Sequence, residues 1–175
     1  MQAQKYNKAF KSDSQRLALS LRSSIAKRRS HLNAALCANK ELMKFIGKYG
    51  EHLVLSQLLK LDIEAYLAIK SNQEDYDITV VLESSRVLRI QVKTTDLHNQ
   101  NTNNSISGVE KRYDFLVLVI MDKNTEHLFI MSREEALALK GNSVKFSCSF
   151  KQSGVSTIKP ELEKYRDNWL TLTGA

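Results

Sequence analysis

Two apolar segments that are separated by four polar residues constrain the fold of this chain more than any other feature. Residues 76–82 and 87–93 are rich in valine, isoleucine and leucine, and the polar residues 83–86 join them. Runs of this length predict two strands, and the short polar connection predicts that they pair as a hairpin. Because side chains alternate between the faces of a strand, Gln91 and Lys93 are expected on the same face of this hairpin.

The hairpin also carries polar groups that are costly to bury. Asp77 lies in the first strand, Gln91 follows fourteen positions later, and Lys93 stands two positions beyond it. A carboxylate, an amide and an ammonium group on one surface must be solvated, paired or bound to a metal. We interpret these residues as a site that handles a metal ion and a phosphate group.

Together with Glu51 upstream, these residues resemble the PD-(D/E)XK nuclease superfamily. The family pattern is an acidic residue on a helix, an aspartate at one strand and a (D/E)-x-K motif on the next, and here Glu51, Asp77 and Gln91-Val92-Lys93 stand at those positions. The resemblance covers residues 45–131 and depends on the ordered set of motifs. Gln91 departs from the pattern, because most members have Asp or Glu there. Some small homing and restriction-type members with Gln are active, and some relatives that lost carboxylates are inactive.

The resemblance implies an α/β fold with a central mixed β-sheet flanked by helices, the restriction-endonuclease-like core. It implies a divalent-metal-dependent endonuclease that acts on double-stranded DNA and uses Mg²⁺, for which Mn²⁺ can substitute. The implied catalytic residues are Glu51, Asp77, Gln91 and Lys93, and the implied metal ligands are Glu51, Asp77, Gln91 and the backbone carbonyl of Val92. Lys93 is expected to orient or deprotonate the attacking water and to stabilise the developing charge.

Positive charge is concentrated at the N-terminus. Residues 1–40 hold nine lysines and arginines against the single acid Asp13, which gives +8; because the whole chain carries +7, residues 41–175 sum to −1. Apolar residues recur near helical spacing in residues 12–40, which predicts one or two amphipathic helices. We therefore divide the chain into a basic helical N-terminal extension, residues 1–40, and a nuclease-like domain, residues 41–175. The extension is typical of a polyanion-binding arm, although a charge run is often only a solvated helix face.

Contacts with DNA are predicted for six basic residues: Lys27, Arg28, Arg29, Lys48, Lys111 and Arg112. A one-site chain of 19.9 kDa would cut both strands most simply as a homodimer or a higher homo-oligomer. The alternative is a catalytically inactive nuclease-fold DNA-binding protein, which Gln91 favours and the other three site residues disfavour. An RNA-directed nuclease or a basic RNA-binding module ranks third, because aromatic residues are only 7 % of the chain and no stacking motif is present.

Cysteine usage and hydropathy predict a cytoplasmic protein. Cys37 and Cys148 lie far apart without metal-ligand spacing, so both are interpreted as free buried thiols in a reducing compartment. No apolar run approaches the ~20 residues that a membrane-spanning helix needs, and no membrane contact is expected. The N-terminus lacks the apolar core of a signal peptide.

A helix is predicted over residues 40–61, just before the hairpin. Its inward-facing residues are predicted to be Leu42, Phe45, Ile46, Leu53, Leu58 and Leu59. Gly47 and Gly50 inside it each cost ~1 kcal/mol relative to alanine, which predicts a close approach of the backbone to DNA or to the sheet. Glu51 follows these glycines; taken alone, it would be interpreted as a helical acid paired with a nearby lysine such as Lys48.

The remaining elements follow from periodicity and capping signals. Strands are predicted over residues 63–69, 115–121, 127–131 and 144–150, and residues 96–110 are predicted to be a loop. Ser132 begins a capping box for a short helix that ends at Gly141. Pro160 begins a final helix, whose inner face is predicted to hold Leu162, Tyr165, Trp169 and Leu170.

Overall fold

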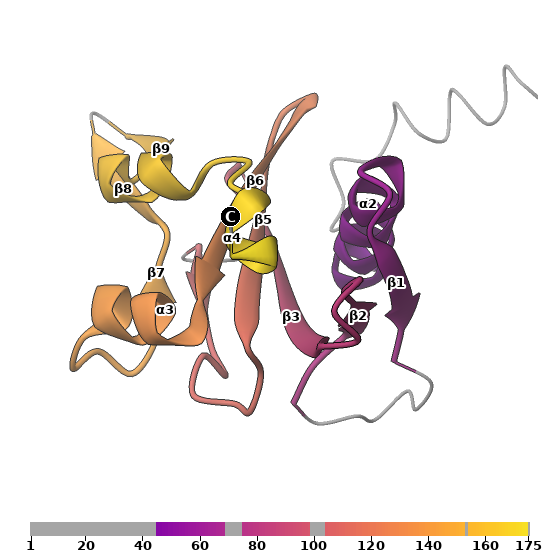
Figure 1. Ribbon diagram of the computed structural model, residues 1–175. Coiled ribbons are helices and arrows are strands. Elements are labelled where there is room, and N and C mark those ends of the chain that lie inside the picture. Colours follow the sequence, from indigo (N-terminus) through magenta and orange to yellow (C-terminus); the bar gives the residue numbers. More distant parts are fainter. Residues whose placement is uncertain (1–44, 69–74, 99–103, 153, 175) are drawn as a thin grey trace, which may run out of the picture. The chain divides into compact units, whose positions relative to one another are not determined.

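The computed structural model describes residues 45–68, 75–98, 104–152 and 154–174. These residues form an α/β fold around a five-stranded mixed sheet of order β1-β2-β3-β5-β6 (Figure 1). The strands are β1 (Glu64–Leu67), β2 (Ile78–Val81), β3 (Val87–Asp96), β5 (Phe115–Asp122) and β6 (Thr125–Ser132). The predicted fold class is confirmed. The predicted basic extension, with Lys27, Arg28, Arg29 and Cys37, lies outside the described residues.

The predicted hairpin is confirmed as β2 and β3. The two strands pair antiparallel, with Ile78 opposite Ile90. In the turn, the Leu82 N–H donates to the Arg86 carbonyl at 2.9 Å. Alternate apolar residues of both strands enter one core cluster, so the polar residues between them face the other side of the sheet.

The long strand β3 joins this hairpin to the rest of the sheet. It pairs in parallel with β5, from Ile90 opposite Phe115 to Asp96 opposite Met121. Residues 115–120 of β5 are all buried, as expected for a central strand that is covered on both faces. The predicted strand pair 115–121 and 127–131 is therefore confirmed, with β5 and β6 antiparallel.

Helices cover the two faces of the sheet separately (Figure 1). On one face lies α2 (Ile46–Lys60), whose buried residues Gly50, Val54 and Leu58 are spaced one turn apart. The other face is covered by α3 (Arg133–Lys140), the 3₁₀ helix η1 (Pro160–Tyr165) and the two-stranded pair β4 (Ser105–Ile106) and β7 (Phe146–Ser147). Within the described ranges, no helix is long and apolar enough to span a bilayer.

The inner face of α2 differs in part from the prediction. Leu58 is buried and Leu53 packs against the core as predicted, but Phe45 is 69 % exposed and Leu59 is 52 % exposed. Phe45 precedes the first turn of the helix, and Leu59 is one position, or about 100°, away from the buried Leu58. Residues 40–44, and with them Leu42, lie outside the described residues.

The prediction of a simple loop over residues 96–110 is wrong in part. Ile106 and Asn104 are buried, and β4 pairs with β7. The Asn104 side chain donates to the Leu97 carbonyl at 3.2 Å, and its Oδ1 accepts from Thr95 at 3.3 Å. These hydrogen bonds satisfy the buried side chain of Asn104, which the sequence assigned to the loop.

Two predictions in the C-terminal third are also wrong in part. Instead of one strand over residues 144–150, the structure has two short strands, β7 and β8 (Ser149–Gln152), and β8 pairs with β9 (Val155–Ile158). Val144 lies before β7 and is 87 % exposed. The final helix is the 3₁₀ helix η1 followed by a separate turn, α4 (Leu170–Thr173). Leu162 and Tyr165 are buried because residues three apart share a face of a 3₁₀ helix, whereas Leu170 is exposed.

The capping box at Ser132 is confirmed. Its hydroxyl accepts from the Glu135 N–H at 3.2 Å, and the Glu135 carboxylate accepts from the Ser132 N–H at 2.8 Å. The helix ends at Gly141, which has a positive φ of 57°. Cys148 is a free buried thiol as predicted, and burial raises its pKa to about 11.

Candidate functional site

Asp77, immediately before β2, lies beside the middle of β3. Its N–H donates to the Ile90 carbonyl at 2.8 Å, which extends the hairpin pairing by one residue. Its Oδ2 accepts a hydrogen bond from the Val92 N–H at 2.7 Å and a second one from Gln91 Nε2. The structure therefore brings the predicted residues Asp77 and Gln91 into direct contact.

Gln91 is 3 % exposed, and only one end of its amide has hydrogen-bond partners. Nε2 donates to Asp77 and also, at 3.3 Å, to the Val92 carbonyl. Oε1 is buried and has no hydrogen-bond partner among the described residues. Because a buried acceptor without a partner costs about 1–3 kcal/mol, this oxygen would be stabilised by a water molecule or a cation.

Glu51 approaches this site from α2. The preceding residue, Gly50, packs against Thr94 of β3, which confirms the predicted close approach to the sheet, whereas Gly47 has no atom within 4 Å of a Cβ position. The Glu51 carboxylate is paired with Lys48 at 2.6 Å; the Glu51 side chain is 14 % exposed and that of Lys48 is 64 % exposed. The helical ion pair expected for an isolated acid is therefore present.

Burial moves the pKa values of the two charged residues of the hairpin toward each other. It raises the pKa of Asp77, against the hydrogen bond from the Val92 N–H and the positive charges of Lys93 and Lys48; the negative charge of Glu51 adds to the rise. Burial lowers the pKa of Lys93, against the attraction of Asp77. Burial thus disfavours the charged form of both groups. Residues with such shifted pKa values are concentrated at functional sites.

The donor atoms around Asp77 fit a hard divalent cation. Such ions prefer oxygen ligands, and the carboxylates of Asp77 and Glu51 together with the unpartnered Oε1 of Gln91 are oxygen ligands. No group of three His, Cys, Asp or Glu side chains that could hold a metal ion occurs in the part of the chain that the structure describes. A cation here would therefore depend on two carboxylates and on neutral oxygens.

The segment that precedes β5 places a second lysine near Lys93. A Cβ on Gly108 would lie 3.4 Å from Lys111 Cε and 3.8 Å from Lys93 Nζ. The charge of Lys111 contributes to the lowered pKa of Lys93. Arg133 holds this segment, donating from Nε to the Lys111 carbonyl at 2.7 Å and from Nη2 to the Glu110 carbonyl at 3.0 Å. The sequence predicted Lys111 as a DNA contact, but no motif pointed to Gly108 or Arg133.

Arg112, the neighbour of Lys111, is exposed on the surface. It stays a prediction as a DNA contact, as Lys48 does. No functional role was expected for Thr94, whose hydroxyl is the second buried side-chain group without a hydrogen-bond partner among the described residues. Thr94 follows Lys93 directly in β3, and Gln91 stands two positions before it. The two buried groups without a partner, Gln91 Oε1 and Thr94 Oγ1, therefore belong to residues on either side of Lys93.

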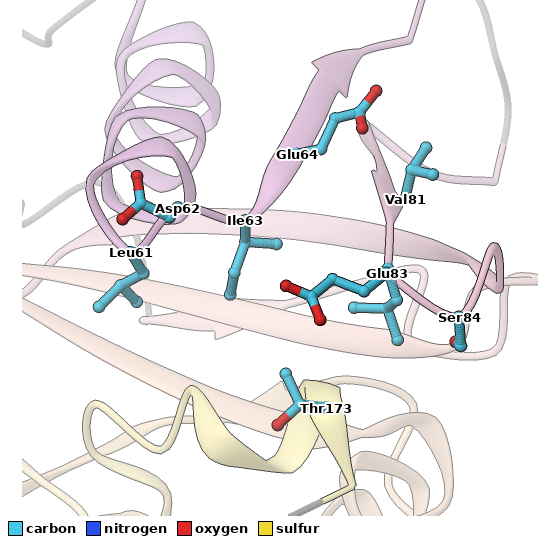
Figure 2. Close-up of a pocket in the computed structure, with 9 residues that line it drawn as sticks. Leu61, Asp62, Ile63, Glu64, Val81, Glu83, Ser84 and Thr173 are labelled. Atoms are coloured by element: carbon cyan, nitrogen blue, oxygen red, sulfur yellow. The ribbon is translucent and has the colours of Figure 1, made fainter.

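A cavity of about 620 Å³ lies at the other end of the hairpin (Figure 2). It is lined by Leu61, Asp62, Ile63, Glu64, Val81, Leu82, Glu83, Ser84 and Thr173. Three of these nine residues are acidic, and the Glu83 side chain extends toward Ile63 (Figure 2). Strand β2 separates this cavity from Asp77. The negative charge of the cavity lining would repel a phosphate group. The cavity is therefore distinct from the cluster around Asp77.

The comparisons with known proteins concern the fold. No protein-family model matches the chain, and no curated protein matches it. The solved structure of a bacterial homing endonuclease, I-Ssp6803I, is similar with a TM-score of 0.54 and 15 % sequence identity. The match covers 77 % of this chain and 95 % of that chain. At this level of identity the likeness establishes a shared fold, so the chain has the fold of a homing endonuclease structure, while membership of the PD-(D/E)XK superfamily stays a prediction.

Proposed function

We propose that this chain is a divalent-metal-dependent endonuclease that hydrolyses phosphodiester bonds in double-stranded DNA. The observation that carries this proposal is the direct contact of Asp77, just before β2, with Gln91 of β3, where Lys93 and Glu51 are close enough to shift the pKa of Asp77. The fold shared with a homing endonuclease supports DNA as the substrate class. A homodimer or a higher homo-oligomer would supply one site for each strand.

The cofactor of the proposed reaction is Mg²⁺, for which Mn²⁺ can substitute. Asp77, Glu51 and the unpartnered Gln91 Oε1 would hold it, with the Val92 carbonyl as the further ligand that the resemblance implies. When bound, such an ion lowers the pKa of a water ligand and neutralises negative charge on the phosphate.

Lys93 handles the proton in this proposal. Lys93 orients the attacking water or accepts its proton; burial lowers the pKa of Lys93, which makes its proton easier to lose than that of an ordinary lysine. The resulting ammonium group then stabilises the negative charge that develops on the phosphate. Asp77 is oriented for its role by the Val92 N–H, which is fixed in the backbone of β3.

A catalytically inactive DNA-binding protein is the second candidate function. Gln91 Nε2 donates to Asp77 Oδ2, so the amide occupies a carboxylate oxygen that a metal ion would use. On this alternative, Lys48, Lys111 and Arg112 bind the phosphate backbone of DNA and no bond is cut.

Cleavage of plasmid DNA separates the two candidates. The protein and its Asp77→Ala and Lys93→Ala variants are incubated with supercoiled plasmid and with a branched DNA junction in Mg²⁺, Mn²⁺ or EDTA. The nuclease proposal expects cutting that requires metal and is lost in both variants, while circular dichroism shows an intact fold. Salt-sensitive binding without cutting in either metal supports the inactive protein. If Lys93→Ala cuts at the parental rate, the proposed role of Lys93 is wrong.

A further inference from the structure

Lys93 and Lys111 approach the same point of the backbone from different segments. A Cβ on Gly108 would meet Lys111 Cε at 3.4 Å and Lys93 Nζ at 3.8 Å, so the space beside this glycine is shared by the two side chains. Gly108 has a positive φ of 76°, which a residue with a side chain adopts only with strain. Because Gly108 has no side chain, both lysine side chains can lie beside its backbone.

The arrangement of the two lysines favours an additional anion beside them. Lys93 is half-buried, and within the described ranges it forms no hydrogen bond and no ion pair of 4 Å or less. An ammonium group has three donors, and leaving them unsatisfied in a partly buried place costs free energy. The positive charge of Lys111 nearby adds repulsion, which a negatively charged ligand would turn into attraction.

The second lysine is held in place by the fold. Arg133, at the start of α3, donates to the carbonyls of Lys111 and Glu110, and Glu110 is paired with Lys140 at 2.7 Å. The hydroxyl of Tyr113 donates to the Val109 carbonyl at 2.6 Å. The backbone around Lys111 is thus anchored, so the Lys111 side chain starts from a fixed point and its Cε lies beside Gly108, as Lys93 Nζ does.

We propose that Lys93 and Lys111 form a two-lysine clamp for the phosphodiester group that is cut. This proposal rests on the proposed nuclease function and assigns Lys111 to the reacting phosphate itself, whereas the sequence predicted only a contact to the DNA backbone. Lys111 binds a non-bridging oxygen of that phosphate and stabilises the charge that develops there. Arg133 is a positioning residue, because it acts through the backbone of Lys111.

Binding of inorganic phosphate tests the clamp without any cleavage. The protein is labelled with ¹³C at lysine Cε, its signals are assigned with lysine variants, and phosphate is added. The clamp predicts that the Lys93 and Lys111 signals shift together with one common dissociation constant, while the signal of the exposed Lys145 does not move. In Lys111→Met, the affinity for phosphate that the Lys93 signal reports decreases at least tenfold. Lys111→Arg restores this affinity. If neither signal moves at millimolar phosphate, the clamp is wrong.

Kinetics distinguish the reacting phosphate from a remote one. Single-turnover cleavage is measured at saturating duplex DNA, and the dissociation constant is measured with Ca²⁺ in place of Mg²⁺. Loss of a stabilising contact to the reacting group lowers the rate by about a hundredfold with little change in affinity, and this is expected for Lys111→Met. Lys145→Met, which also removes one exposed positive charge, leaves the rate unchanged. A weaker affinity with an unchanged rate in Lys111→Met would place Lys111 on a remote phosphate and overturn the proposal.

The two experiments separate the clamp from the nuclease proposal. A protein that cuts no DNA but shows the coupled phosphate shifts has a two-lysine phosphate site and is not a nuclease, which overturns the proposed function. A protein that cuts DNA through Asp77 and Lys93, but shows no phosphate effect at Lys111, retains the nuclease and loses the clamp.

Discussion

Gly50 of α2 packs so closely against Thr94 of β3 that no side chain fits between them. A Cβ on Gly50 would overlap Thr94 Oγ1 and stand 3.0 Å from Thr94 Cβ. Because Glu51 is the next residue, this contact sets how near the Glu51 backbone lies to β3. The close packing of α2 on β3 therefore helps to position Glu51 in the candidate site.

Replacing Gly50 with alanine is expected to destabilise the protein. Alanine favours a helix by ~1 kcal/mol over glycine, but overpacking a filled contact costs about 1–3 kcal/mol. We expect a net decrease in the free energy of unfolding, measured by urea denaturation, together with weaker metal binding because α2 must move away from β3. The matched control is Gly47→Ala in the same helix, where nothing lies within 4 Å of the new Cβ. That variant should be unchanged or slightly more stable; equal effects at both glycines would contradict the packing argument.

Gly108→Ala is expected to reduce both phosphate binding and cleavage. The new Cβ would stand in van der Waals contact with Lys111 and near Lys93 Nζ, and it would strain a backbone with φ of 76°. Gly154→Ala is the control, because Gly154 has a similar φ of 82° but no atom within 4 Å of its Cβ position. Thermal unfolding should show a similar loss of stability in both variants, whereas only Gly108→Ala should lose activity. Parallel losses of activity would mean that strain alone explains the effect.

Gln91→Glu is expected to bind metal more tightly and to be less stable without it. The substitution adds a carboxylate ligand, which raises the affinity of an oxygen site for a hard cation. Without metal, it replaces the hydrogen bond from Gln91 Nε2 to Asp77 with repulsion between two carboxylates. The melting temperature should fall in EDTA and recover with Mg²⁺, unlike that of the exposed Gln152→Glu. A variant that melts like the parent in EDTA would show that these side chains are not in contact.

Lys48→Met is expected to raise the affinity for Mn²⁺, measured by calorimetry. Lys48 is ion-paired with Glu51 at 2.6 Å, so a metal ion that binds Glu51 must compete with it. The control is Lys60→Met, which removes an exposed lysine from the last turn of the same helix. A lower affinity in Lys48→Met than in Lys60→Met would show that Lys48 supports the metal site instead of competing with it.

Lys93 is expected to make the stability of the protein depend on alkaline pH. Its folded-state pKa lies below the usual 10.5 because of burial, so between these two values the unfolded chain binds more protons. The free energy of unfolding should therefore rise as the pH rises through the folded pKa toward 10.5. Lys93→Met should be more stable than the parent at pH 7 and should lack this rise. Denaturation midpoints from pH 7 to pH 10.5 test it, and a parent protein that loses stability over that range relative to the variant would refute the assignment.

Local sequence patterns were sufficient to predict the elements that are formed by residues close together in sequence. The hairpin with Asp77 and Gln91 follows from two apolar runs and a four-residue connection, and the helix at Ser132 follows from its capping box. In both cases the interacting groups lie within about fifteen residues of each other. The same hairpin was enough to place the carboxylate and the amide together.

Long-range packing explains what the sequence did not predict. Lys111 reaches Lys93 only because β3 and β5 pair in parallel and Arg133 fixes the segment before β5. The exposure of Phe45 depends on where α2 begins against the sheet, which periodicity alone does not determine. The paired segment around Asn104 likewise depends on β7, about forty residues away.

The parallel pairing of β3 with β5 also predicts an order in which parts of the candidate site fold. The β2–β3 hairpin closes a short loop, so its entropy cost is low, whereas β3 and β5 must close a connection of more than fifteen residues. A chain that folds from the hairpin outward assembles Asp77 and Gln91 before Lys111 arrives. On this expectation the contact of Asp77 with Gln91 is built early and locally, whereas Lys111 joins the candidate site only when β5 has paired with β3.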